Sequence, residues 1–112
     1  MKVVLMAVGS ELLRPGRRES HSDQITPLLE FSGLEVESRR VVSDRQWEIE
    51  EALEEARRRP RLIIVTGGIG PTRDDRTREA LGDALGRPLR RDPLAARAIR
   101  AWCRRHRIPH TR

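Results

Sequence analysis

The stretch 61-RLIIVTGGIGPTRDDRTREALGDAL-85 decides the fold of this chain. It begins with an apolar run at residues 62–65, which is typical of a strand buried on both faces of a sheet. Residues 66–72 follow as a loop with three glycines and one proline, and from Arg73 the apolar spacing predicts a helix. This order places main-chain amides and a helix N-terminus at the carboxyl edge of a sheet, a geometry that suits an anion.

Two carboxylates, Asp74 and Asp75, lie where this helix is expected to start. Thr72 can cap the helix, and Asp75 then completes an acidic variant of the capping box. One interpretation is that both aspartates only complement the helix dipole. A cap needs one acid rather than a pair, so we favour a second interpretation. In it, a divalent cation such as Mg²⁺ lies between these carboxylates and the phosphate oxygens of a ligand.

The loop matches neither of the common nucleotide-binding loops. A P-loop needs lysine and then serine or threonine after its last glycine, and the only lysine of the chain is Lys2. A dinucleotide fingerprint reads G-x-G-x-x-G, whereas this loop reads G-G-x-G-P-T.

The remaining elements are predicted from apolar periodicity and from turn residues. Residues 2–8 are almost wholly apolar and predict a central strand, and residues 34–42 predict a second strand nearer an edge. The predicted helices cover residues 21–32 with Ser20 or Ser22 as cap, residues 47–59, and residues 93–105. Their expected apolar side chains are Ile25, Leu28, Leu29 and Phe31 in the first helix, and Ala95, Ile99, Trp102 and a core Cys103 in the last.

Three short segments of mostly small or acidic residues follow the three predicted strands. They are Gly9-Ser10-Glu11, Ser43-Asp44 and residues 66–75. The βαβαβαα order predicts parallel strands joined by right-handed crossovers. Open sheets of this kind bind ligands outside the carboxyl ends of their strands, so we expect the three segments to converge there.

Composition narrows the class of protein. With 112 residues, the chain is expected to form one small domain over 1–112. The net charge of +6 would fit a nucleic-acid partner, but the arginines are interleaved with glutamates and the three aromatics form no stacking platform. A lone cysteine excludes a disulfide framework, and no run approaches the ~20 apolar residues of a membrane helix. A soluble cytoplasmic protein without a membrane or nucleic-acid partner is expected.

The segment TGGIGPTRDDRTREAL, residues 66–81, resembles the signature of the molybdopterin-binding fold. Molybdenum-cofactor biosynthesis proteins share this fold with the N-terminal domain of the competence/damage-inducible CinA proteins. The continuation Pro71-Thr72-x-Asp74-Asp75-x-Thr77 is more similar to the CinA type. Gly9-Ser10-Glu11-Leu12-Leu13 resembles the family's first motif, usually G-T-E-L-L. Asp44 and Asp75 match two acids that, in the cofactor enzymes, are tied to activity on the pterin phosphate.

The resemblance implies an α/β fold, a three-layer α/β/α arrangement with a mostly parallel sheet. It implies a nucleotide- or pterin-phosphate-binding domain with Mg²⁺-dependent pyrophosphatase activity on ADP-ribose-like nucleotides. Asp44 and Asp75 would be catalytic, and Asp74 with Asp75 would hold Mg²⁺. The expected phosphate-binding residues are Gly9, Ser10, Glu11, Gly67, Gly68, Gly70, Pro71 and Thr72. The alternatives are a non-catalytic binding module and a molybdopterin adenylyltransferase-like protein.

The sequence departs from the family pattern in two places. Ser20, His21 and Ser22 stand where the family carries an N-T-N-like run. The chain ends at Arg112, where family members continue into further strands and a closing L-P-G-x-P segment. The last strands are therefore expected to be missing. The CinA deamidase domain is also absent, so deamidation is not expected. A homo-oligomer is one way to cover the exposed sheet edge that would result.

Overall fold

The computed structural model describes residues 1–109 and contains a three-stranded parallel sheet in the order β2-β1-β3. The strands are β1 (Lys2–Val8), β2 (Glu35–Val42) and β3 (Leu62–Thr66). Val8 of β1 lies opposite Val42, and Ala7 lies opposite Thr66, so all three strands end at one edge of the sheet. The central position of β1 and the outer position of β2 confirm the predictions.

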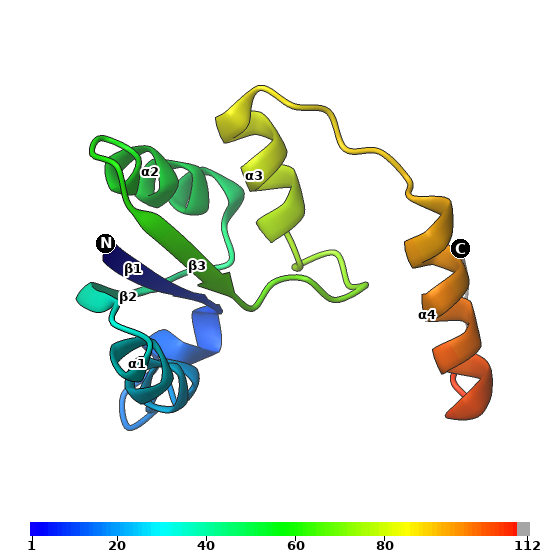
Figure 1. Ribbon diagram of the computed structural model, residues 1–112. Helices are drawn as coiled ribbons and strands as arrows, with labels where there is room; N and C mark the ends of the chain where they lie inside the picture. The colour runs from blue at the N-terminus through cyan, green and yellow to red at the C-terminus, as the bar shows by residue number, and fades with distance from the viewer. Residues whose placement is uncertain (110–112) are drawn as a thin grey trace.

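Helices cover both faces of the sheet in three layers (Figure 1). A short 3₁₀ turn, η1 (Ser10–Leu13), follows β1, and α1 (His21–Phe31) lies on one face. On the other face α2 (Gln46–Ala56) packs beside α3 (Thr77–Leu85). The main core lies between this second face and the two helices. Its buried members are Val4, Met6, Val8, Val42, Ile49, Ala52, Leu53, Ala56 and Ala80. The α/β three-layer prediction is confirmed.

β3 is less buried than its sequence predicts. Leu62 is 37% exposed, and the four residues that follow are only half-buried. Within residues 1–109, β3 pairs with β1 alone, and its second edge has no neighbouring strand. The prediction that this strand is buried on both faces is therefore wrong. An apolar run shows that burial would be favourable, but it does not show that another element packs against the strand.

α4 (Pro93–Arg105) has the predicted bounds but not the predicted environment. The side chain of Asp92 accepts the Leu94 N–H at 2.9 Å and caps the helix. α4 lies apart from the sheet at the end of an extended segment (Figure 1), and Ile99 and Trp102 are 53% and 46% exposed. Cys103 is buried, yet it belongs to α4 and not to the main core. Among the described residues, none of the helices combines the length and apolar character that crossing a bilayer requires.

α1 begins at His21 as predicted, but neither serine caps it. The carboxylate of Glu19 accepts the Ser22 N–H at 2.9 Å, and the Ser20 side chain makes no capping hydrogen bond. Gly33 follows the helix with φ +84, the left-handed conformation expected of a glycine at this position. The predicted apolar stripe is partly wrong, because Leu28 and Phe31 point to solvent.

Candidate functional site

The three segments predicted to converge meet at the carboxyl edge of the sheet, with the end of β1 in the middle. The Gly9 N–H donates to the Val42 carbonyl at 2.9 Å, which ties the end of β1 to the end of β2. The Ser10 hydroxyl donates to Oδ1 of Asp44 at 2.6 Å and accepts the Asp44 N–H at 3.2 Å. On the other side, the glycine loop approaches the backbone of β1 closely at Val8.

Two glycines of this loop are required by its geometry. Gly67 and Gly68 have φ angles of +86 and +67, which side chains rarely adopt. A Cβ on Gly67 would lie 2.2 Å from the Val8 carbonyl oxygen, and a Cβ on Gly68 would lie 2.2 Å from the Thr77 hydroxyl. Neither position accepts a larger residue without movement of the loop.

The first two residues of α3 hold four consecutive carbonyl oxygens of the glycine loop. Thr77, which is buried, donates its hydroxyl to the Gly67 carbonyl at 2.8 Å and its amide to the Gly68 carbonyl at 3.1 Å. The Arg78 guanidinium donates to the carbonyls of Ile69 and, at 3.0 Å, Gly70. The amides of Gly68 and Ile69, in contrast, make no hydrogen bond within residues 1–109. The carbonyl oxygens, which would repel an anion, are thus bound by α3, and the two amides remain available to donate to one.

α3 begins at Thr77, four residues later than the sequence pattern predicts. Thr72 and Asp75 instead form a separate turn before it. Oδ2 of Asp75 accepts the Thr72 N–H at 2.9 Å and the Thr72 hydroxyl at 2.7 Å. The prediction that Thr72 caps the helix is therefore wrong. The local capping-box contact forms, but the Thr77 amide is bound to Gly68 across the loop, so the helix starts only after the chain has returned there.

The contacts of Asp75 keep its carboxylate ionised. Hydrogen bonds from the Thr72 hydroxyl and amide hold the pKa of Asp75 below its ordinary value, and the charge of Arg78 acts in the same direction. Asp74 beside it is exposed and makes no hydrogen bond or ion pair within residues 1–109. The two neighbouring aspartates thus have different environments.

The carboxylates at this edge suit Mg²⁺ if a bound ligand supplies further oxygens. Within the described part of the chain, no group of three or more His, Cys, Asp or Glu side chains comes together as a metal site. Among residues 1–109 Asp44 keeps Oδ2 free of hydrogen bonds, and Asp75 lies beside Gly70 in the glycine loop. Because Mg²⁺ is often held by one or two carboxylates together with substrate phosphates, these residues fit the ion as partners of a bound phosphate group.

The other predicted site residues lie around this edge with few contacts of their own. Glu11 is exposed, and its carboxylate lies against Gly9. Pro71 and Thr72 are exposed at the tip of the loop. The structure thus brings together Gly9, Ser10 and Asp44 on one side, and the glycine loop and Asp75 on the other.

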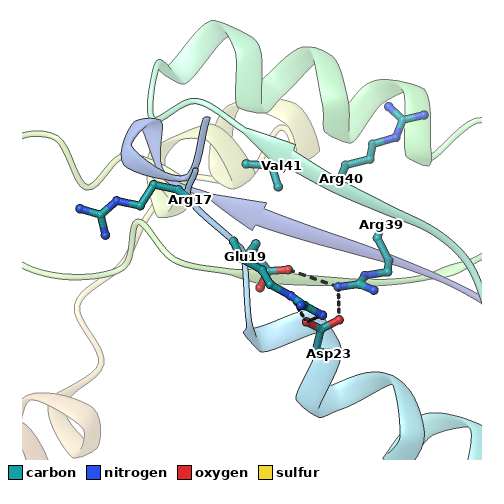
Figure 2. A pocket seen from close by; sticks show the side chains of 7 residues that line it. Arg17, Glu19, Asp23, Arg39, Arg40 and Val41 are labelled. Atoms are coloured by element: carbon teal, nitrogen blue, oxygen red, sulfur yellow. Dashed lines mark hydrogen bonds and ion pairs between the residues drawn. The ribbon is translucent and has the colours of Figure 1, made fainter. Parts of the chain in front are cut away.

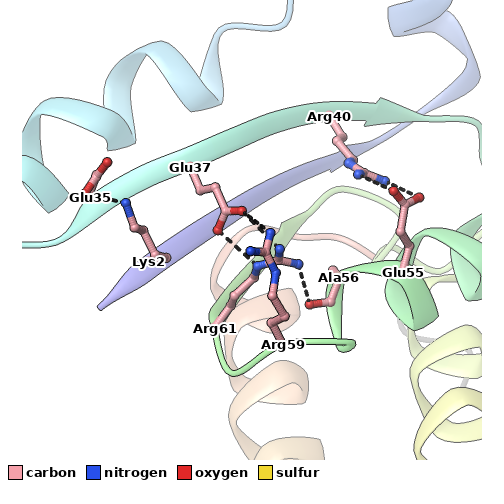
Figure 3. A network of polar contacts seen from close by, with 8 residues as sticks. All are labelled: Lys2, Glu35, Glu37, Arg40, Glu55, Ala56, Arg59 and Arg61. Atoms are coloured by element: carbon pink, nitrogen blue, oxygen red, sulfur yellow. Dashed lines mark hydrogen bonds and ion pairs between the residues drawn. The ribbon is translucent and has the colours of Figure 1, made fainter.

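Two surface hollows lie away from these residues. The first, of about 420 Å³, lies between the 17–23 segment and β2 (Figure 2), and the second, of about 350 Å³, lies between β2 and the end of α2. In the first, Arg39 binds Asp23 at 2.7 Å. In the second, Arg40 binds Glu55 at 2.8 Å, and Arg59 and Arg61 share Glu37 (Figure 3). Several of the arginines that line the two hollows are thus paired with carboxylates.

Sequence reasoning did not identify Thr77 and Arg78 as parts of the loop. Thr77 was visible as the last residue of the Pro71-Thr72-x-Asp74-Asp75-x-Thr77 pattern, which could have been recognised as a loop anchor. Arg78 carries no such signal, because an arginine at the start of a helix ordinarily extends into solvent.

Comparisons with known proteins agree with the fold. Residues 4–108 match a family described as "Probable molybdopterin binding domain". The chain is 36% identical over 108 residues to a CinA-like protein of Acidobacterium capsulatum. The aligned region covers 96% of this chain and 26% of that protein. A crystal structure of the protein CinA from Thermoplasma acidophilum is similar with a TM-score of 0.75 and 32% identity, over 81% of this chain and 54% of the other.

A second solved structure is that of the molybdopterin biosynthesis enzyme MoaB from Thermus thermophilus. It is similar with a TM-score of 0.67 and 27% identity, over 73% of this chain and 53% of the other. The chain spans about a quarter of the length of the curated relatives it matches and about half the length of these solved structures.

Proposed function

The chain belongs to the family described as "Probable molybdopterin binding domain", and on this premise we propose that its glycine loop binds the phosphate of a nucleotide or pterin. We further propose a Mg²⁺-dependent hydrolysis of the pyrophosphate in ADP-ribose-like nucleotides. The observation that carries the proposal is the asymmetry of the loop. Its carbonyl oxygens at residues 67–70 all accept hydrogen bonds from α3, whereas the amides of Gly68 and Ile69 make none within residues 1–109.

The free amides would donate hydrogen bonds to phosphate oxygens. Gly67 and Gly68 allow the backbone turn that carries these amides. The Thr77 hydroxyl holds that turn by donating to the Gly67 carbonyl. Backbone donors of this kind are already oriented when the ligand arrives, so they need no rearrangement. They would bind phosphate in any nucleotide or pterin without reading its base.

The carboxylates supply the second part of the proposed chemistry. Two acids at the edge of a phosphate site would repel the ligand unless a cation lies between them. Asp75, with Asp44 or Asp74, would hold Mg²⁺, and the 2.6 Å hydrogen bond from Ser10 would keep the Asp44 carboxylate oriented. When bound, Mg²⁺ neutralises negative charge on the phosphates and lowers the pKa of a coordinated water. The Thr72 hydrogen bonds that lower the pKa of Asp75 also hold its carboxylate in place beside the loop.

Hydrolysis of ADP-ribose by the full chain, with Mg²⁺ or with EDTA, tests this proposal. The wild type is expected to release AMP and ribose 5-phosphate only with Mg²⁺, and Asp75→Ala is expected to abolish the reaction. Asp92→Asn is the matched control, because it removes one negative charge at the start of α4, away from the loop. Unchanged turnover in Asp75→Ala would refute the role assigned to that carboxylate.

The similarity to MoaB favours a second candidate function, adenylyl transfer to a pterin phosphate. The same loop would then bind the phosphate of molybdopterin, and ATP would supply the adenylyl group. Calorimetry with ADP-ribose and with molybdopterin compares the two ligands. Product analysis then separates hydrolysis, which yields two monophosphates, from transfer, which releases pyrophosphate. Binding without either product would indicate a non-catalytic module.

A further inference from the structure

Arg78 is bound to the glycine loop through the main chain. Its two terminal nitrogens donate to the carbonyl oxygens of Ile69 and Gly70. Arg39, Arg40 and several other arginines pair with carboxylates, whereas Arg78 forms no ion pair among residues 1–109. Its positive charge is therefore held beside the loop and is not cancelled by a directly bonded acid.

The neighbouring arginines do not share this position. Arg76 donates to the side-chain oxygen of Gln46 at 2.7 Å, and Gln46 in turn donates to Asp83 at 2.6 Å. This chain of hydrogen bonds turns the Arg76 guanidinium toward α2. Arg73 is exposed and makes no hydrogen bond in the described residues. Arg78 is thus the arginine whose contacts fix it at the loop.

The Arg78 guanidinium has more donors than its contacts with the loop use. Two of its five N–H groups are used on the loop carbonyls, which leaves donors available. Binding to carbonyl oxygens also neutralises the partial negative charges that would oppose an anion. Arginine combines a permanent charge with donors suited to phosphate oxygens. The attraction it adds should grow with the negative charge of the ligand.

We propose that Arg78 makes the glycine loop selective for ligands with two linked phosphates over those with one phosphate or none. This inference rests on the proposed function and names the ligand class of the same site. In this role Arg78, which also holds two carbonyls of the loop, adds specificity to the shape that Thr77 and the glycines give it.

Calorimetric titration with ADP, AMP and adenosine in the presence of Mg²⁺ tests the proposal. The wild type is expected to bind ADP more tightly than AMP, and AMP more tightly than adenosine. Arg78→Met should weaken ADP binding about tenfold, the loss expected for one hydrogen bond between charged groups. It should weaken AMP binding less and leave adenosine unchanged. Arg78→Lys keeps the charge and should retain part of the preference for ADP.

Arg97→Met on α4 is the matched control, because it removes the same charge from an exposed helix position apart from the sheet. It should leave all three affinities unchanged. If Arg78→Met weakens the three ligands by the same factor, or weakens none, the specificity role is overturned while the proposed phosphate site stands. If the wild type binds neither nucleotide, the proposed function and this inference both fail.

Discussion

The Ser10 hydroxyl donates a 2.6 Å hydrogen bond to Asp44, which lies 34 positions further along the chain. The same hydroxyl accepts the main-chain N–H of Asp44 at 3.2 Å. These two contacts join the loop after β1 to the loop after β2 and orient the carboxylate at the edge of the sheet. The side chain of one small polar residue thus sets the position of a proposed metal ligand.

Ser10→Ala removes both contacts and should lower the free energy of unfolding by about 1 kcal/mol, the usual net value of an exposed hydrogen-bonded pair. It should also reduce Mg²⁺-dependent turnover, because Asp44 loses its orientation. Ser10→Thr keeps the hydroxyl and serves as the control, with wild-type stability expected. Urea unfolding of the three proteins measures the difference. Equal stability of the alanine variant and the wild type would show that the contact contributes nothing.

Gly68→Ala should destabilise the chain more than Gly86→Ala. Both glycines have positive φ angles, +67 and +64, so both substitutions carry backbone strain of about 1–3 kcal/mol. Of these two, only Gly68 would place the added Cβ in a collision, at 2.2 Å from the Thr77 hydroxyl, whereas no atom of residues 1–109 lies within 4 Å of a Cβ at Gly86. The difference between their unfolding free energies in urea therefore isolates the close approach of the loop to α3. Equal losses would contradict that close approach.

Glu19→Gln should remove a pH-dependent part of the stability. Burial alone would raise the pKa of Glu19, but hydrogen bonds from Ser22 and His21 outweigh it, and with the charge of Arg39 they lower the pKa below the ordinary 4.5. A carboxylate with a lowered pKa stabilises the fold above the unfolded pKa, and this stabilisation is lost as the pH falls through the folded pKa.

The wild type should therefore exceed Glu19→Gln in stability at pH 7 by up to about 1 kcal/mol, because glutamine keeps an oxygen that can accept the Ser22 N–H but loses the charge. The gap should close as the pH falls below 4.5. Thermal unfolding across this range, with Ser20→Ala as the control, measures the gap. Ser20 makes no capping hydrogen bond, so its variant should behave as the wild type at every pH. A gap between the wild type and Glu19→Gln that is independent of pH would contradict the role of the charge.

Local features of the chain were predictable because they depend on residues close in sequence. The burial of β1 follows from its apolar run. The end of α1 follows from Gly33, and the start of α4 follows from Asp92-Pro93. The glycine loop was also recognisable, since positive φ angles require glycine in the sequence itself. The start of α3 was not predictable from local sequence, because the Thr72–Asp75 contact satisfies a capping pattern without beginning a helix.

By itself, the sequence determined the parallel α/β order, the central strand and the edge of the sheet where the acids and glycines gather. Tertiary structure alone decided that Ser10 binds Asp44, that Glu19 and not a serine caps α1, and that Thr77 and Arg78 engage the carbonyls of the loop. It also decided that β3 and α4 leave apolar side chains exposed. The physical reason is the range of the interactions. Periodicity and φ preferences act within a few residues, whereas polar groups choose partners from every element that folding brings within reach.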